Sequence, residues 1–328
     1  MIKKSIVFLC SILSLALLSA CGEGEVKSYN EGIHIIPMPQ ELVEGEGQFV
    51  VNSGTSMGAT TDEAKTIAEF FAAKISASTG YSIKVADEGN IMLAIDESLD
   101  TNDEGYTLDV TAEGVKAVGK TPQGLFYAMQ TLMQLLPAEI ENPEKTRGIA
   151  WVAPAVSIKD QPRFGYRGIM LDPCRHFMPA ENVKKYIDVI ALFKMNRMHW
   201  HLTDDQGWRI EIKKYPKLME VAAKRMEGEG VEHAGYYTQE EIKDIVKYAA
   251  DRFITIVPEL ELPGHEMAAI AAYPELSCQG VKESPRIIWG VEDVVMCPAK
   301  EEVFKFLEGA PPAWTRFPSA ATGALPCP

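Results

Sequence analysis

Residues 196–216 read NRMHWHLTDDQGWRIEIKKYP and hold the densest group of chemically capable side chains in this sequence. Successive side chains of a β-strand point to opposite faces, so His199 and His201 share one face, and Met198, Trp200 and Leu202 share the other. Asp204 and Asp205 follow directly, before a polar Gln-Gly-Trp-Arg turn. The stretch therefore predicts a strand with one apolar and one polar face, ended by two carboxylates.

The chain around this stretch repeats a strand, a polar loop and a helix. Predicted strands cover residues 166–172, 197–204 and 253–260. A helix begins at Pro179, and another begins at Thr238, where Thr238 and Glu241 form a capping box. This alternation predicts a parallel sheet of the (β/α)8, or TIM barrel, type. A doubly wound open sheet would favour a glycine-rich phosphate loop after the first strand, and the sequence has none there.

Residues 33–160 are expected to form a separate small α/β domain. A helix over 64–80 has Gly80 as its C-cap, and a helix over 121–137 has Thr121 as N-cap and Pro122 in its first turn. Alternating segments at 106–110 and 115–119 predict two strands. This part holds no cluster of catalytic residue types, which favours a scaffold or docking role. The predicted fold class is α/β: a small N-terminal α/β domain followed by an incomplete TIM (β/α)8 barrel over 161–308.

The first 21 residues have the pattern of an export signal. Lys3 and Lys4 precede an apolar stretch, and the sequence LSAC ending at Cys21 resembles the bacterial lipobox. A membrane-spanning anchor is the alternative, but the apolar run is short for a span. We therefore expect residues 1–21 to be a lipoprotein signal peptide, Cys21 to be lipidated and residues 22–32 to be a tether. The protein would be an exported bacterial lipoprotein of the outer membrane or periplasm, and its lipid would attach it to a membrane.

Charge and cysteine content limit the classes of partner and the kinds of site that the chain is expected to have. The formal net charge of −14 argues against a nucleic-acid partner, because phosphate binding requires a basic face. No two cysteines have metal-site spacing. Cys278 and Cys297 lie 19 residues apart in a loop-like segment of a chain expected to be exported, so they are a candidate disulfide.

Polar side chains follow each of the three predicted strands. Arg175 comes after the first strand, Asp204 ends the second, and Glu259 and His265 come at and after the third. The carboxyl ends of barrel strands meet at one rim, where active sites lie. Each residue alone is read most simply as a salt bridge or a cap. Together they provide a cation for hydroxyls, carboxylates and a titratable relay, which predicts a pocket.

The two histidines and two aspartates of the opening stretch allow other interpretations of the site. A His-x-His pair on a barrel strand is able to hold a metal, but it needs ligands from later strands, and only His265 is a strong one. Histidines hydrogen-bonded inside the barrel wall are therefore favoured, and no metal is expected. Adjacent side chains at a strand end diverge, so we expect Asp204 in the pocket and Asp205 in the turn, without a shared proton.

Several longer motifs resemble glycoside hydrolase family 20, the β-N-acetylhexosaminidases. They are RGIMLDPCRHF (167–177), the stretch 196–216, GYYTQEEIKDIVKYAADRFITIVPELELPGH (235–265), YPELSCQG (273–280) and MCPAKEEVFKFLE (296–308). IIPMPQELVEGEG (35–47) and GLFYAMQTLMQLLP (124–137) resemble that family's N-terminal α/β domain. The resemblance runs from about residue 33 to 308.

The resemblance implies a substrate and a reaction. Arg175 would bind hydroxyls of a terminal N-acetylglucosamine or N-acetylgalactosamine of a glycan. Asp204 and His265, with Glu259 as a weaker member, would form the charge network that supports the catalytic acid. The family cleaves with retention through the substrate's own acetamido oxygen, an exception to the two-carboxylate scheme, and needs no cofactor. An aspartate orients the acetamido group, and the adjacent glutamate protonates the leaving oxygen.

That catalytic pair, carried in the family by a His-x-Gly-Gly-Asp-Glu motif, does not occur here. No Asp-Glu pair follows residue 265. Residues 309–328 hold five prolines and five alanines but no acidic residue, and we interpret them as an unrelated tail rather than a natural Pro/Ala-rich one. The sequence therefore predicts no catalytic residues of its own and impaired hydrolysis. A non-catalytic glycan-binding lipoprotein is the alternative.

Overall fold

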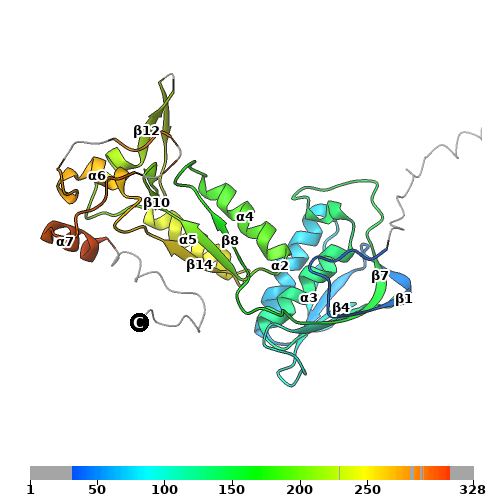
Figure 1. The fold of residues 1–328 in the computed structure, drawn as a ribbon. Coiled ribbons are helices and arrows are strands. Elements are labelled where there is room, and N and C mark those ends of the chain that lie inside the picture. The colour runs from blue at the N-terminus through cyan, green and yellow to red at the C-terminus, as the bar shows by residue number, and fades with distance from the viewer. Residues whose placement is uncertain (1–31, 229, 281–283, 289, 291, 311–328) are drawn as a thin grey trace, which may run out of the picture. The chain divides into compact units, whose positions relative to one another are not determined.

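The computed structural model describes residues 32–310, except residues 229, 281–283, 289 and 291 (Figure 1). It divides into two compact units, one ending at Pro162 and one beginning at Arg163. The expected signal peptide with Cys21, nearly all of the tether and almost the whole of the tail at 309–328 lie outside the described residues.

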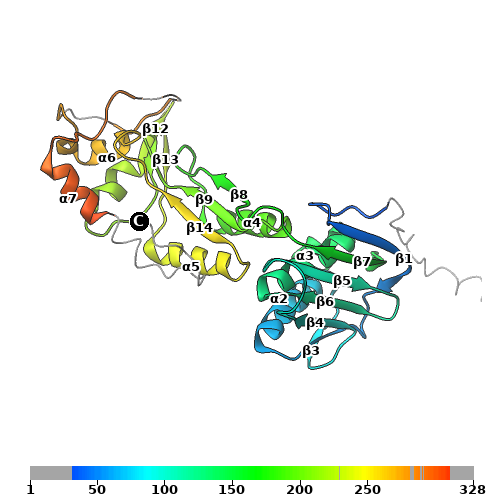
Figure 2. The ribbon, with the colours of Figure 1, turned by 60° about the horizontal axis from the view of Figure 1, so that its bottom comes forward.

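A seven-stranded mixed sheet forms the centre of the N-terminal unit. Its order is β1-β7-β5-β6-β4-β2-β3, and Figure 2 labels all of these strands except β2. The strands are β1 (Glu41–Val50), β2 (Ser56–Ala59), β3 (Lys84–Ala86), β4 (Ile91–Ile95), β5 (Tyr106–Val110), β6 (Val115–Gly119) and β7 (Val152–Asp160). The half from β3 to β6 is parallel, whereas β5, β7 and β1 are added antiparallel. The strands predicted at 106–110 and 115–119 are confirmed.

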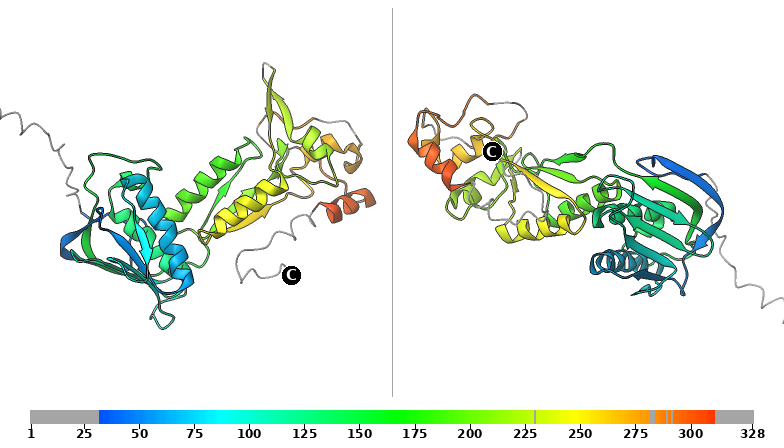
Figure 3. Two further views of the ribbon diagram at one scale, coloured as in Figure 1. Left: turned by 180° about the vertical axis from the view of Figure 1, so that it is seen from behind. Right: turned by 90° about the horizontal axis from the view of Figure 1, so that it is seen from below.

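Two helices, α2 (Asp62–Thr79) and α3 (Pro122–Leu135), cover one face of this sheet (Figure 3), and η1 (Ala138–Glu141) follows α3. Gly80 ends α2 at a φ of 73°, which a residue without Cβ adopts freely. Thr121 caps α3 and Pro122 opens it, as predicted. Beneath the helices the rings of Phe71 and Phe126 lie 5.2 Å apart in an apolar core.

Three parallel strands and two helices organise the C-terminal unit. The strands β8 (Gly168–Leu171), β9 (Arg197–His201) and β14 (Thr255–Glu259) lie in the order β14-β9-β8. The helices α4 (Ala180–Leu192) and α5 (Gln239–Ala250) connect them, and α5 begins with the predicted capping box. Asp188 of α4 accepts hydrogen bonds from Tyr248 and Arg252, at 2.7 and 2.5 Å, which holds the helices together. Parallel strands in chain order with helices between them are the barrel pattern that the sequence predicted.

The strand predicted over 197–204 is shorter than expected. β9 ends at His201: the Leu202 N–H still donates to the carbonyl of Glu259 on β14, but Thr203 pairs with Trp208 in a separate ribbon. That ribbon is β10 (Thr203–Asp204) with β11 (Gly207–Trp208). The remaining elements are η2 (Leu218–Ala222), β12 (Lys224–Glu227), β13 (Val231–Ala234), α6 (Met267–Ala272), η3 (Pro274–Leu276) and α7 (Glu301–Gly309). A disulfide joins Cys278 to Cys297, the pair that the sequence offered as a candidate.

Candidate functional site

The carboxyl ends of β8, β9 and β14 bring five polar side chains together. This rim cluster consists of Asp172, Arg175, His201, Asp204 and Glu259. Strand register explains the meeting, because Glu259 of β14 pairs with His201 of β9, and paired residues of parallel strands point to the same face. Arg175, Asp204 and Glu259 were expected here from the sequence.

Arg175 links the first two strands of the cluster. Its guanidinium donates to Asp172 Oδ2 at 2.9 Å and lies 2.6 Å from Asp204 Oδ2. The other oxygen of Asp172 accepts the backbone N–H groups of Cys174 and Arg175, which fixes the loop that carries the arginine. The Arg175 side chain remains 35% exposed.

His201 lies between two carboxylates. Its Nδ1 is 2.6 Å from Glu259 Oε2 and its Nε2 is 2.8 Å from Asp204 Oδ2. Burial lowers the pKa of His201, but the bonds to Asp204 and Glu259 outweigh this and raise the pKa to about 9. In return, burial raises the pKa of Glu259, and hydrogen bonding to His201 more than reverses it, to about 2. The pair is thus held as imidazolium and carboxylate at neutral pH, with His199 also bonded to Glu259.

Asp204, Asp205 and His265 form the inner side of the site. His265 Nδ1 lies 3.3 Å from Asp204 Oδ1 and 3.7 Å from Asp205 Oδ2, so both aspartates face one imidazole. Both aspartate side chains are almost completely buried. The expectation that Asp205 serves its own turn is wrong, because its Oδ1 accepts the backbone N–H of Met267 at 3.1 Å. The second aspartate therefore ties β10 to the start of α6.

Arg209 stabilises the loop that carries Asp172 and Arg175, and it was not identified from the sequence as part of the site. It is fully buried, and its guanidinium donates to the carbonyl groups of Pro173, Cys174, Ala223 and Gly235 at 2.7–3.0 Å. Burial lowers its pKa to about 10, which leaves it cationic at neutral pH. It holds the loop of Asp172 and Arg175 against the segments on either side of the β12–β13 hairpin.

Three groups of side chains in the described residues have donor atoms close enough for a metal ion. They are Asp172 with Cys174 and His201, His199 with His201 and Glu259, and Asp204 with Asp205 and His265. Much of each group is committed to hydrogen bonds and ion pairs within the protein. Cys174, for example, is buried, donates to the carbonyl of His201 at 3.0 Å and has its pKa raised by burial. The sequence-based expectation of a metal-free site stays a prediction.

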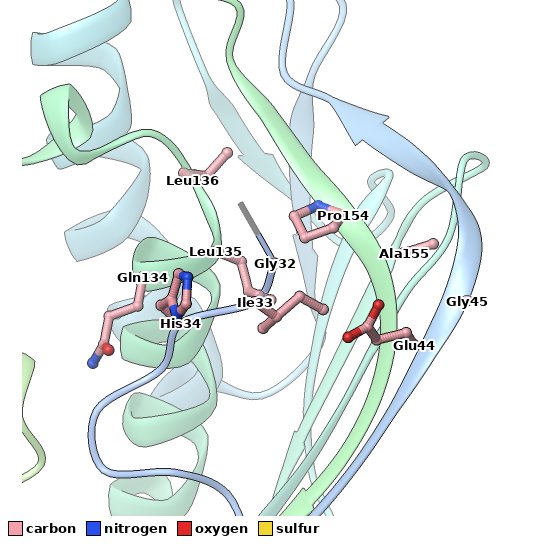
Figure 4. A pocket seen from close by; sticks show the side chains of 10 residues that line it. All are labelled: Gly32, Ile33, His34, Glu44, Gly45, Gln134, Leu135, Leu136, Pro154 and Ala155. Carbon is pink, nitrogen blue, oxygen red and sulfur yellow. The ribbon is translucent and has the colours of Figure 1, made fainter. Parts of the chain in front are cut away.

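The N-terminal unit has a separate pocket of about 250 Å³ (Figure 4). Its walls come from residues 32–34, the end of α3, β1 and β7. Gln134 donates to the Ile36 carbonyl and accepts its N–H, so the amide fastens the chain entering the unit. His34 and Glu44 contribute the ionisable groups, and no group of three metal-ligand side chains was found among the described residues of this unit. The predicted scaffold role of this unit stays a prediction.

Sequence reasoning missed Asp172 as a site residue, although its position carried a signal. It ends a predicted strand, as Asp204 does, and it lies within the motif in which Arg175 was recognised. His201 was predicted to be hydrogen-bonded in the barrel wall, and it is; that it connects two carboxylates depends on strand register, which the sequence does not show.

Comparisons with known proteins identify the family. Residues 164–310 match the family model described as "Glycosyl hydrolase family 20, catalytic domain", and residues 32–161 match "Glycosyl hydrolase family 20, domain 2". The chain belongs to glycoside hydrolase family 20. It is 49% identical over 313 residues to a β-hexosaminidase of Porphyromonas gingivalis, which covers 93% of this chain and 40% of that relative.

Comparison with solved structures of β-hexosaminidases supports the same family. A variant of the Streptomyces plicatus β-hexosaminidase in complex with its product N-acetylglucosamine has a TM-score of 0.80 at 35% identity, over 88% of this chain and 57% of that one. The β-N-acetylhexosaminidase of Bacteroides fragilis has a TM-score of 0.73 at 34% identity, over 88% of this chain and 55% of that one. The predicted family and α/β fold class are confirmed. The chain spans less than two thirds of the length of each of these relatives.

Proposed function

We propose that the C-terminal unit recognises a terminal, non-reducing N-acetylhexosamine of a glycan. The part-exposed side chain of Arg175, with its guanidinium fixed by Asp172 and Asp204 at the carboxyl ends of parallel strands, carries this proposal. A planar donor held by two carboxylates presents its remaining N–H groups in a fixed direction, which suits neighbouring sugar hydroxyls. The product complex of the Streptomyces plicatus relative supports N-acetylglucosamine as the sugar.

We further propose that the whole protein is a glycosidase that uses the family's substrate-assisted, retaining reaction. In that reaction the rim cluster provides a fixed charge pattern, with a cationic His201 between ionised Asp204 and Glu259. The Asp-Glu pair that would orient the acetamido group and protonate the leaving oxygen is not among these 328 residues. Loss of a general acid typically removes about 10²–10⁴-fold of rate, so this chain by itself would bind the sugar with strongly impaired hydrolysis.

Binding and turnover test the two parts separately. Calorimetry of the purified chain with N-acetylglucosamine should give saturable heat, and Arg175→Lys should weaken binding about tenfold, because a lysine ammonium cannot reproduce the planar fork. Arg197→Lys is the matched control, since Arg197 begins β9 at the opposite end of the strand. Absence of any heat at millimolar sugar would refute the binding proposal. Hydrolysis of an aryl N-acetyl-β-glucosaminide at the rate of a complete family 20 enzyme would refute the impairment.

We also propose that the protein is exported and that Cys21 carries a lipid. The lipobox-like sequence supports this, and so does the Cys278–Cys297 disulfide, because such bonds persist mainly in oxidising compartments. None of the helices described in the structure combines the length and apolar character needed to cross a membrane. Mass spectrometry of the membrane fraction should find a diacylglyceryl group on Cys21. A Cys21→Ser chain that remains in the membrane pellet would contradict lipid attachment.

A further inference from the structure

The β12–β13 hairpin presents two side chains to the β8–α4 loop, which carries Arg175. Arg225 of β12 and His233 of β13 are directly opposite each other in the strand register, so both side chains lie on one face of the hairpin. The next pair, Met226 with Glu232, lies on the other face, and both of its members are exposed. One face of the hairpin is therefore available to contact the loop, and the other is open to solvent.

Arg225 connects the hairpin to the backbone of Arg175. Its guanidinium donates to the carbonyl of Arg175 at 2.5 Å and to the carbonyl of Gln206 at 3.0 Å. Only 3% of the Arg225 side chain is exposed, and the carboxylate of Glu227 on the same strand balances its charge. A buried cation is tolerated when it is both paired and hydrogen-bonded, as it is here. Arg225 thus ties the β8–α4 loop to the turn between β10 and β11.

His233 holds the same loop two residues further along the chain. Its Nε2 accepts the backbone N–H of Phe177 at 2.9 Å, which requires a neutral imidazole with its proton on Nδ1. Burial lowers the pKa of His233, and the charges of Arg225 and Arg209 lower it further, so the ring is neutral at neutral pH. The hairpin therefore binds the loop on both sides of His176, once through a carbonyl and once through an N–H.

We propose that Arg225 and His233 are positioning residues that act through Arg175, because they fix the backbone from which its side chain reaches the sugar. Asp172 and Asp204 hold the guanidinium end of that side chain, and the hairpin holds its backbone end. A binding group that is ordered before the ligand arrives gives higher affinity, since its ordering does not subtract from the binding free energy. This inference rests on the proposed sugar binding and extends it to the hairpin.

Amide hydrogen exchange tests the backbone contact without any sugar. In His233→Leu the Phe177 amide loses its acceptor, and its exchange at pH 7, followed by NMR, should become about fivefold faster. His233→Gln has an oxygen able to accept at the same position and should return the exchange rate to within about twofold of the wild type. Glu232→Gln, on the exposed face of the hairpin, is the matched control, and the amides of α5 show whether the unit remains folded. An unchanged Phe177 rate in His233→Leu would overturn the proposal.

A double-mutant cycle separates positioning from general stability. In calorimetry at pH 7, Arg225→Met should bind N-acetylglucosamine about fivefold more weakly than the wild type, whereas in an Arg175→Lys background the same change should matter by less than about twofold. Arg225→Lys should recover part of the affinity, and Glu232→Gln should bind as the wild type does. A loss by the same factor in both backgrounds, or no loss in Arg225→Met, would overturn the positioning role. A wild type that binds no sugar would refute the proposed function, and the Phe177 exchange rate would still decide whether the hairpin fixes the loop.

Discussion

The two units of the chain bury very different kinds of residue. Among the described residues of the N-terminal unit the buried charged residue is Asp160, which accepts hydrogen bonds from Tyr106 and the backbone of Gln40, and the other buried polar side chains are uncharged. The C-terminal unit buries many more charged residues: Lys194, His201, Asp204, Asp205, Arg209, Arg225, Arg252, Glu266 and Arg286. Buried charge is costly unless it is paired, so its concentration in one unit marks where structure serves chemistry rather than stability alone.

This difference in buried charge predicts the largest loss of stability for a substitution of Arg209. In Arg209→Met, four carbonyl groups lose a charged donor, although those of Ala223 and Cys174 keep a second one from the Gly235 N–H and from Arg225. At about 1 kcal/mol or more for each lost bond, the C-terminal unit should lose at least about 4 kcal/mol. Urea titration followed by hydrogen exchange and mass spectrometry reads peptides of each unit separately. Arg209→Lys should recover only part of the loss, since an ammonium cannot reach all four oxygens. A loss below about 1 kcal/mol would show that Arg209 is not structural.

The counterpart in the N-terminal unit is an apolar residue. Phe126 is buried between α2 and α3, with its ring 5.2 and 5.6 Å from those of Phe71 and Phe70. Phe126→Ala should cost about 3–4 kcal/mol through lost burial and a cavity. The loss should appear in peptides of residues 32–162, while the affinity for N-acetylglucosamine stays that of the wild type. A large loss of sugar affinity would show that the N-terminal unit is more than a scaffold.

The C-terminal unit should also respond more strongly to alkaline pH. The pKa of His201 is raised to about 9 from an unfolded value of about 6.5, so its contribution is complete below pH 6.5 and disappears as pH rises to 9. After allowance for solvent screening and coupling to Glu259, we expect this contribution to be roughly 2 kcal/mol. His201→Gln should lose stability at pH 6 and little at pH 9.5. If the variant and the wild type differ equally at both pH values, the histidine is not held as a cation.

Local signals in the sequence predicted most elements, because they act within one turn of chain. Thr121 with Pro122, and Thr238 with Glu241, set helix starts without reference to the rest of the fold. The site was predicted where its residues followed strands, as with Arg175 and Asp204. It was missed where partners are distant in sequence: Arg209 bonds to Pro173, and Arg225 bonds to Arg175.

The smallest predicted loss of stability concerns the helix N-caps, for which the two units should give similar losses. Thr61 caps α2 by accepting the N–H of Ala64 at 3.3 Å, and Thr238 caps α5 by accepting that of Glu241 at 3.1 Å. Replacement of either threonine by alanine should cost about 1 kcal/mol. Thr238→Ala should cost slightly more, because the Thr238 hydroxyl also bonds to the Glu241 carboxylate, which in turn accepts the Thr238 N–H at 2.8 Å.

Urea titrations of both variants measure this comparison. Threonine-to-serine changes at the same positions, which keep the capping oxygen, serve as controls. Similar losses in the two alanine variants mean that the units differ in their buried charge and not in how their helices are built. A loss above about 3 kcal/mol at Thr238 alone would mean that the start of α5 is coupled to the site through Tyr237, whose ring lies 4.7 Å from that of Trp200 on β9.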